Sequence, residues 1–294
     1  MARLGTALGW PHYSSGWHAT CTAGAPAAAV TAGIALGLTG KTLATAIALA
    51  IPAAGGVQRS FGTMAKPLQV GFAVSAGIRA ARLAKAGAGA DHGVLEEWMH
   101  LVGGDPGAID LSGPAVPGGL AIKVYPCCYA LQRPIAAVSG LGLDASTVTA
   151  IRVRTPANTL QPLNRHSPTT GLEGKFSLEY GIATALLDSP IGFAAFSDAS
   201  VHRAEAQRLV SLLSVEMVAG ASGEGLLDGE FEVIIEAGGK THRGTLRLPP
   251  GAPERPPSDQ ELAAKVADCC GHRAASVMDL DWVRAAPLLR QSLD

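Results

Sequence analysis

The sequence predicts a mainly α-helical protein that carries one smaller α+β domain. Apolar residues make up 48% of the 294 residues but aromatic residues only 5%, so the core consists mostly of small aliphatic side chains that pack helices closely. Helical periodicity dominates roughly the first hundred residues. The alternation typical of strands begins only near residue 120.

The first domain, which we expect to span 1–115, is predicted to be all-helical. Helices at 23–39 and 41–51 are apolar nearly all round, so other elements must cover them on every side. A third helix starts at about Lys66, because a proline follows in a position suited to the first helical turn. It ends before Gly87, with cationic residues in its last turns where the helix dipole favours them.

Glycine and proline gather near 113–118, which predicts a domain boundary and an α+β domain at 116–250. A glycine pair at 238–239 is a hairpin signal between the last two of its strand patterns. The strand patterns lie at 120–125, 148–154, 231–235 and 245–248, and the helical patterns at 129–141, 173–188 and 201–213.

The chain returns to helical patterns in its last part, 251–294. Ser258 and Glu261 form a capping box that opens a helix over 262–270, and a second helical pattern covers 279–293. We expect these helices to pack back on the first domain.

Charge and cysteine content exclude several classes of function. The 23 Lys and Arg residues nearly balance the 24 Asp and Glu residues, so the chain has no electrostatic footprint for nucleic acid or anionic lipid. Five cysteines, four of them in adjacent pairs, make a poor disulfide framework and indicate reduced thiols in the cytoplasm. The apolar run at 23–57 is interrupted too often to reach the ~20 residues that a membrane span needs.

Lys66 lies where a helix disfavours a cation, next to the positive end of the dipole. An anion bound between its ammonium group and the free backbone N–H groups would remove this conflict. A substrate carboxylate fits that description. The alternative is a lysine in an ordinary surface loop, and His18, which we expect to face the same space, has the alternative of a hydrogen-bonded structural residue.

Lys123 and Tyr180 are the candidate residues of the second domain. Lys123 falls in the predicted strand at 120–125, and Tyr180 falls within the helix at 173–188, where a tyrosine is most often a core residue with its hydroxyl satisfied. The adjacent Cys127 and Cys128 cannot alone hold a zinc ion or an iron–sulfur cluster. We therefore predict no metal.

Four motifs of the sequence resemble the MmgE/PrpD family, in the right order and spacing, over about residues 8 to 270. The family includes 2-methylcitrate dehydratase, cis-aconitate decarboxylase and an iminodisuccinate epimerase. The motifs are GWHAT at 16–20, GTMAKPLQVG at 62–71, KVYPCC at 123–128, and GKFSLEY at 174–180 followed by ALLD at 185–188.

The resemblance implies an all-helical domain with an inserted α+β lid domain, and cofactor-free chemistry on small di- or tricarboxylates between the two. It also assigns the active-site residues of the family to positions in this chain. The catalytic set falls on His18, Lys66, Lys123 and Tyr180, and we expect Thr63, Cys128 and Lys175 to contribute to substrate binding.

The chain departs from the family pattern in two places. Family members begin with a longer helical region that bears a His and Asp motif, whereas residues 1–17 hold only His12 and no aspartate. We expect that region to be absent, supplied by a second chain or lost to a late start codon. Cys128 stands where the decarboxylase branch has a histidine, which makes decarboxylation the less favoured activity.

Dehydration of a polycarboxylate of the 2-methylcitrate type is the activity we expect. It needs proton transfer, for which His18 is the best group, and cations such as Lys66 and Lys123 that hold carboxylates and the developing enolate charge. Tyr180 would donate a proton or a hydrogen bond. Epimerisation would use the same enolate, decarboxylation is a third activity, and a truncated, non-catalytic partner subunit is the competing class.

We also expect the chain to form a homodimer, as the family does. Without upstream helices, the apolar hairpin at 23–51 keeps an uncovered face, and large apolar patches rarely stay exposed to water.

Overall fold

The computed structural model describes residues 1–220, 225–281, 283–285 and 287. The described chain is mainly helical and contains one four-stranded sheet. It divides into two compact units. The first segment of one unit ends at Gly119, and the first segment of the other begins at Leu120. The helical unit comprises Met1–Gly119, Pro156–Arg165 and Val218–Gly229, and the α+β unit comprises the remaining described residues.

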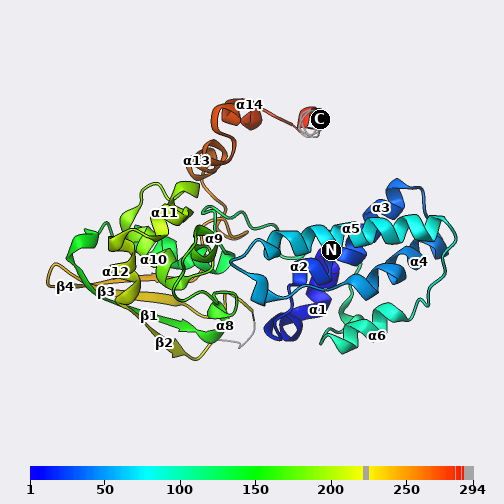
Figure 1. Cartoon of the computed structure of the whole chain (residues 1–294), viewed down its shortest axis with the longest axis horizontal. Coiled ribbons are helices and arrows are strands. Elements are labelled where there is room, and N and C mark those ends of the chain that lie inside the picture. Colours follow the sequence, from blue (N-terminus) through cyan, green and yellow to red (C-terminus); the bar gives the residue numbers. More distant parts are fainter. Residues whose placement is uncertain (221–224, 282, 286, 288–294) are drawn as a thin grey trace. The chain divides into compact units, whose positions relative to one another are not determined.

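In the helical unit, small residues allow three long helices to pack closely. α5 contacts both α3 and α4 along its length (Figure 1), and alanines fill most of the buried contact. Gly77 marks the tightest point, since a Cβ atom there would lie 2.5 Å from the backbone oxygen of Ala25. The helices of this unit are α1 (Ala2–Ser14), α2 (Ala19–Thr22), α3 (Gly24–Ala35), α4 (Gly40–Ala50), α5 (Ala65–Lys85), α6 (Val94–Leu101) and α8 (Ala157–Leu160).

The predicted helices of this unit are present with small shifts at their ends. α5 starts one residue before Lys66, and Gly87 follows it with a φ of 95°. α1 was not predicted, because a glycine and a proline interrupt its pattern, and the helix is indeed kinked at Gly9. The hairpin of α3 and α4 is covered by α5, so the exposed apolar side chains lie chiefly on α5 rather than on the hairpin.

The α+β unit is built on a four-stranded sheet in which the neighbouring strands β1 and β3 are not consecutive in the chain. β1 (Val148–Pro156) pairs antiparallel with β3 (Phe231–Ala237), β3 pairs antiparallel with β4 (Lys240–Leu246), and the order is β2-β1-β3-β4 with β2 at Leu213–Val218. Two-residue alternation buries Phe231, Val233, Ile235 and Ala237 on one face of β3.

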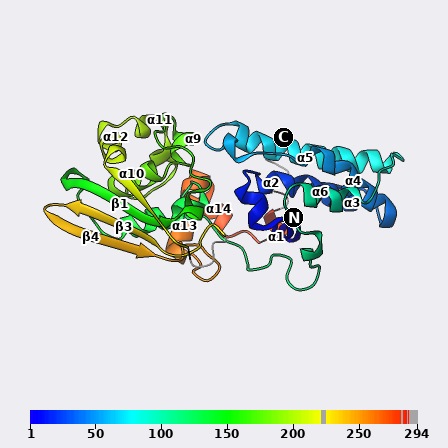
Figure 2. The ribbon, with the colours of Figure 1, turned by 90° about the horizontal axis from the view of Figure 1, so that it is seen from below.

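Helices cover this sheet, and Figure 2 shows α9 to α12 gathered on one side of it. α7 packs on β3 and β4, where Gly244 admits the backbone of Ala137. The helices of the unit are α7 (Gln132–Ser139), α9 (Gly171–Gly174), α10 (Leu178–Leu187), α11 (Asp198–Val201), α12 (Ala204–Ser211), α13 (Asp259–Cys270) and α14 (Ala274–Met278).

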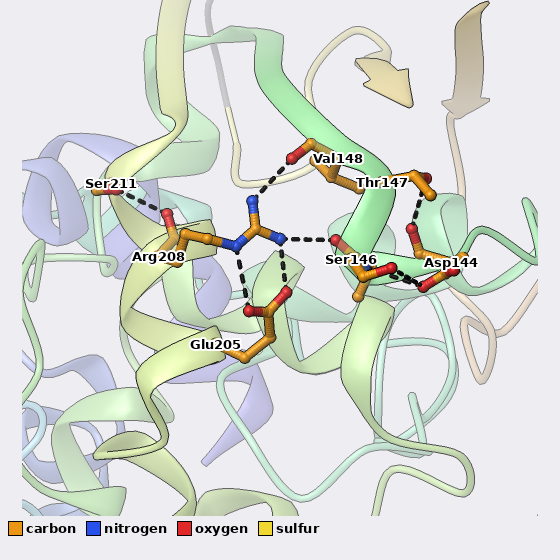
Figure 3. Close-up of polar contacts among 8 residues, drawn as sticks. Asp144, Ser146, Thr147, Val148, Glu205, Arg208 and Ser211 are labelled. Atoms are coloured by element: carbon orange, nitrogen blue, oxygen red, sulfur yellow. Dashed lines mark hydrogen bonds and ion pairs between the residues drawn. The ribbon is translucent and has the colours of Figure 1, made fainter. Parts of the chain in front are cut away.

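Arg208 joins α12 to the start of β1 (Figure 3). Its guanidinium group donates to the backbone oxygens of Val148 at 2.8 Å and Ala145 at 2.7 Å, and it pairs with Glu205 at 2.6 Å. Because the guanidinium group is charged and several acceptors hold it at once, it fixes the position of α12 relative to the start of β1.

Strands and turns of this unit agree with the sequence in part. The predicted strands at 148–154 and 231–235 lie within β1 and β3, whereas the one at 245–248 overlaps only the last two residues of β4. Gly238 and Gly239 form the two-residue hairpin with positive φ at both positions. The predicted strand at 120–125 is wrong: this segment is irregular, and it meets the chain at Gly251 through a bond from the Ile122 N–H to the Gly251 oxygen at 2.8 Å.

Two predicted helices are also corrected. The segment at 173–188 is broken, because Ser177 caps a new helix by accepting the N–H of Tyr180 at 3.1 Å. The segment at 201–213 ends earlier than expected, and β2 follows it directly.

The C-terminal part contains the predicted capping box of α13, in which Ser258 and Glu261 bond reciprocally. The described residues from Glu230 on group with the α+β unit, and the expected return of the C-terminal helices to the first domain stays a prediction. The helix expected at 279–293 lies largely outside the described residues. Among the described helices, none is both long and apolar enough to cross a membrane.

Candidate active site

His18 is positioned by two segments that meet in the helical unit. Trp17 and Val57 form an antiparallel bridge, and the Gln58 N–H donates to the Gly16 oxygen at 2.8 Å. The His18 N–H donates to the Gly56 oxygen at 2.9 Å. His18 then caps α2, so its backbone is held on both sides and its ring has little freedom.

The ring of His18 is 95% buried and has defined neighbours. Its Nδ1 atom lies 2.6 Å from Nε2 of Gln69 and 3.0 Å from Sγ of Cys21. The ring of Phe61 meets it edge to face, with centroids 4.9 Å apart. Gln69 and Cys21 were missed by the sequence reasoning, although both lie within four residues of the residues it singled out.

Cys21 and His18 form a close thiol and imidazole pair, an arrangement that activates cysteine nucleophiles elsewhere. Here Cys21 is fully buried, and burial raises the pKa of its thiol, an effect that the positive charge of Lys66 partly offsets. The thiol form is therefore favoured, and the fully buried sulfur is closed to a substrate. Cys21 supports the histidine rather than attacking.

Lys66 lies in the first turn of α5, beside the same cluster. Its Nζ atom is 5.1 Å from the centroid of the Phe61 ring, the ring that also contacts His18. Thr63, a predicted substrate-binding residue, has its hydroxyl engaged locally: it donates to the Ser60 oxygen at 2.7 Å and accepts the Ala65 N–H at 3.3 Å. The structure thus brings His18, Lys66 and Thr63 into one part of the helical unit.

His12 is a structural residue. Its Nδ1 faces the backbone oxygen of Val102 at 2.8 Å, and since a carbonyl only accepts, Nδ1 carries the proton. Nε2 then accepts from the hydroxyl of Thr22 at 2.8 Å, and the ring stacks on Trp17. Burial lowers the pKa of His12, while the bond to Val102 opposes this effect.

This lowered pKa predicts that acid destabilises the helical unit. In the folded state His12 binds its proton less readily than at the ordinary value of about 6.5, so the unfolded state holds more protons below that pH. Stability should be fully present above pH ~6.5 and should fall as the pH drops below it. Thermal unfolding followed by circular dichroism from pH 8 to pH 5.5 measures this.

Two variants isolate the contribution of His12. His12→Gln should be less stable at every pH but should lose part of the slope, whereas the exposed His272→Gln should keep it. An unchanged slope in His12→Gln would contradict the assignment.

In the α+β unit, Lys123 and Lys175 act on the same buried thiol. Burial raises the pKa of Cys127 well above its ordinary range, Cys128 adds to the rise, and the charges of Lys123 and Lys175 oppose it. The Cys128 N–H donates to the Lys175 oxygen at 3.0 Å. Lys123 and Lys175 thus both act electrostatically on Cys127, next to Cys128; the catalytic role expected for Lys123 and the substrate-binding roles expected for Cys128 and Lys175 stay predictions.

Lys123 is exposed and lies in an irregular segment, not on a strand. Lys175 is half-buried, with its Nζ atom 5.1 Å from the centroid of the Phe193 ring. Lys175 directly follows α9, and both lysines act electrostatically on Cys127. They supply positive charge there in a chain whose total charge is nearly zero.

Tyr180 is placed differently from the lysines. Its side chain is fully buried, and its hydroxyl donates to the backbone oxygen of Ala195 at 2.6 Å. Burial raises the pKa of this hydroxyl, and the neighbouring Thr184 and Arg203 oppose the rise. These contacts are those of a satisfied core tyrosine. Its predicted catalytic role would require the hydroxyl to leave Ala195.

The described residues give no sign of a metal centre: nowhere among them do three His, Cys, Asp or Glu side chains lie together as ligands would. The expectation that the protein needs no metal or cofactor stays a prediction. The site residues form two clusters, His18 with Lys66 and Thr63 in one unit, and Lys123 with Cys128 and Lys175 in the other.

The chain belongs to the MmgE/PrpD family. The model of the family's N-terminal domain matches residues 1–102, and the model of its C-terminal domain matches residues 125–282. The first matched region ends before the boundary at 119/120 that separates the first segments of the two structural units. The second matched region begins after it.

Curated relatives carry a lyase name. Cis-aconitate decarboxylase of Aspergillus terreus is 29% identical over 226 residues, which cover 67% of this chain and 46% of that protein. Cis-aconitate decarboxylase of Aspergillus terreus strain NIH 2624 / FGSC A1156 is 29% identical over 224 residues with the same coverage. The chain spans about half the length of these relatives.

Proposed function

We propose that the chain is a lyase of small polycarboxylates, and that it removes water from a β-hydroxy acid of the 2-methylcitrate type through an enolate-like intermediate. The observation that carries this proposal is the retention of cationic side chains in both clusters of a nearly neutral chain: Lys66 beside His18, and Lys123 with Lys175. Ammonium groups at fixed positions suit a substrate with two or three carboxylates.

The chemistry asks little of a cofactor. A base takes the proton on the carbon next to a carboxylate, the electron pair forms a carbon–carbon double bond, and hydroxide leaves after it is protonated to water. Negative charge develops on the carboxylate oxygens during the first step, so cations and hydrogen-bond donors near them lower the barrier. In this reaction, Lys66, Lys123 and Lys175 bind the carboxylates of the substrate. His18 donates a hydrogen bond or a proton to the oxygen atoms that take part in the reaction.

Decarboxylation is the second candidate, because the two curated relatives are named cis-aconitate decarboxylases. In that reaction a carbon–carbon bond breaks, carbon dioxide leaves, and the electron pair left on carbon takes a proton from solvent. The same cations would stabilise the same kind of intermediate. Cys128, in place of the histidine of the decarboxylase branch, favours dehydration.

A substrate panel in deuterated water tests the proposal. The purified chain is incubated with citrate, 2-methylcitrate, cis-aconitate and iminodisuccinate, and the products are followed by NMR. Dehydration yields an alkene. Epimerisation replaces the carbon-bound proton by deuterium and keeps every carbon and oxygen atom of the substrate. Decarboxylation yields a product with one carbon fewer, which carries deuterium where the carboxylate was.

Two controls accompany the panel. His18→Gln, purified in the same way, should lose the turnover, which rules out a contaminating enzyme. Turnover that survives in this variant, or none with any substrate, would contradict the proposal and favour a non-catalytic partner subunit.

We further propose that the chain associates into a homodimer through the exposed apolar side of α5. Leu68, Phe72 and Ile78 expose 52%, 67% and 39% of their surface, and Val74 and Ile78 border an apolar groove of about 500 Å³ with α3. Apolar patches of this kind mark association surfaces. A second chain that supplies the helices expected upstream is the other candidate for covering it.

Light scattering after gel filtration at micromolar concentration should therefore report a dimer. Phe72→Ser should shift the population toward monomer, because it removes the most exposed of the apolar groups that lie on this side of α5. Leu111→Ser removes an exposed leucine elsewhere in the unit and should have no effect. A monodisperse monomer, or equal behaviour of the two variants, would rule the dimer out.

A further inference from the structure

The side-chain amide of Gln69 joins α5 to the backbone beside His18. Its Oε1 accepts the N–H of Val57 at 3.1 Å, and its Nε2 lies 3.3 Å from the Val57 oxygen and 2.6 Å from Nδ1 of His18. One amide group thus contacts both backbone polar groups of Val57 and a ring nitrogen. Such a set of contacts leaves it a single sensible orientation.

The backbone decides that orientation. The Val57 N–H can only donate and the Val57 oxygen can only accept, so the amide must present its oxygen to the first and its nitrogen to the second. If the amide were turned over, its NH2 group would face the Val57 N–H, which is also a donor. Its oxygen would face the Val57 oxygen, which is also an acceptor. The nitrogen of Gln69 therefore faces His18, and its N–H donates to Nδ1.

The surroundings of Nδ1 agree with this direction of donation. Cys21 also lies 3.0 Å from Nδ1, and because burial favours its thiol form, it is a second group with a hydrogen to donate. Gly56 has a φ of 122°, and a Cβ atom there would lie 2.7 Å from Cβ of Cys21. Only glycine lets this backbone come close enough to present Val57 to Gln69.

We propose that Gln69 is a positioning residue that holds His18 as a neutral imidazole with its proton on Nε2. The imidazolium form would carry a second N–H on Nδ1, pointing at the amide N–H of Gln69, so it is disfavoured. Lys66, whose ammonium group contacts the Phe61 ring beside His18, adds a like charge that acts in the same direction.

The tautomer of His18 stands without the proposed function, but the catalytic role that follows from it rests on that function. A histidine with an unprotonated Nδ1 held by a donor is a poor base at Nε2. A neutral imidazole N–H is instead a fixed hydrogen-bond donor, a way in which histidine can polarise a substrate oxygen. His18 would stabilise the developing enolate charge, and another group would remove the carbon-bound proton.

Nitrogen NMR tests the tautomer directly. In protein labelled with ¹⁵N at its histidines, long-range correlations from the ring protons show which nitrogen carries hydrogen, and loss of one signal set in His18→Gln identifies the residue. The wild-type protein should show His18 neutral at pH 7 with its proton on Nε2. A proton on Nδ1, or an imidazolium at that pH, would overturn the proposal without any variant.

Variants then test the part played by Gln69. Gln69→Glu replaces the amide nitrogen by an oxygen that accepts from Nδ1–H, so His18 should become imidazolium at a pH higher by about one unit or more. Gln161→Glu adds the same charge in the same unit, where the amide donates to the Ser14 oxygen, and should leave His18 unchanged. Equal titration of His18 in Gln69→Glu and wild type would reject the inference.

A further variant covers the case in which Gln69→Glu does not fold. Gln69→Met keeps the length of the side chain and removes both polar atoms, so the preference of His18 for one tautomer should weaken, while the Cys21 thiol stays beside Nδ1. A retained preference in this variant would show that Gln69 does not set it. All these NMR readouts are independent of turnover. A protein that is inactive but has the Nε2–H tautomer at His18 would therefore contradict the proposed function and still support the positioning role of Gln69.

Discussion

Replacing Lys66 by methionine is expected to weaken the binding of citrate by about 1.5–3 kcal/mol, the range for a hydrogen bond to a charged group. This corresponds to roughly a 10- to 150-fold increase in Kd. Methionine keeps most of the apolar stem while the ammonium group is lost from the first turn of α5. The N–H groups of Ala65 and Lys66 are bonded to Thr63 and Pro67 has none, so the expected free N–H groups at this helix start are not present and the ammonium group is the main partner left for an anion.

The same change should hardly affect stability. The contact of Lys66 with the Phe61 ring is worth about 0.5–1 kcal/mol. Removing a cation from the positive end of a helix returns a similar amount. Isothermal calorimetry with citrate measures the binding, and circular dichroism checks the fold.

A matched control lies on the same helix. Lys85→Met removes the same group from the opposite end of α5, where it donates to the Leu36 oxygen at 3.3 Å, and should leave citrate binding as it is. If Lys66→Met and Lys85→Met bind citrate equally well, Lys66 is an ordinary surface lysine and the proposed role of its loop fails.

Gly77→Ala is expected to destabilise the contact between α3 and α5 by about 1–3 kcal/mol or more, the range for an overpacked core. The new Cβ atom would lie 2.5 Å from the Ala25 oxygen and 2.6 Å from the Ala29 nitrogen. Backbone atoms cannot swing aside as a long side chain can, so the two helices must separate. The loss should exceed the gain in helix propensity, which is at most about 1 kcal/mol.

Gly71→Ala provides the opposite result on the same helix. Nothing lies within 4 Å of its Cβ position, so only the propensity gain remains and stability should rise by up to about 1 kcal/mol. Hydrogen exchange of the α3 and α5 amides reports the local free energy of opening for both variants. Equal protection in both would mean that the helices do not pack at Gly77.

The fold was predictable from the sequence where local signals were strong. The apolar helices at 23–51, the start of α5 near Lys66, the Gly238 and Gly239 hairpin and the capping box at Ser258 all have causes within a few residues. Such causes include a fixed φ angle, a side-chain cap or one apolar face. The family motifs likewise lie within short segments, so the family membership needed no structure.

Errors arose where distant contacts decide. An apolar stretch at 120–125 has the composition of a strand, but a strand needs a partner along its length. Among the described residues this stretch is joined to a distant segment by the backbone bond from Ile122 to Gly251 alone. Tyr180 looked like a mid-helix residue because periodicity cannot see that Ser177 starts a new helix. The fate of its hydroxyl depends on Ala195, fifteen residues away.

The candidate site shows the same division. The sequence by itself identified the candidate residues, because a lysine at a helix start and a histidine in a short motif can be recognised one residue at a time. Only the tertiary structure decided what state they are in. His18 meets Gln69 across 51 positions, and this contact exists because Gly56 lets the backbone at Val57 approach both. A tautomer is set by atoms in contact through space, and sequence order does not record that contact.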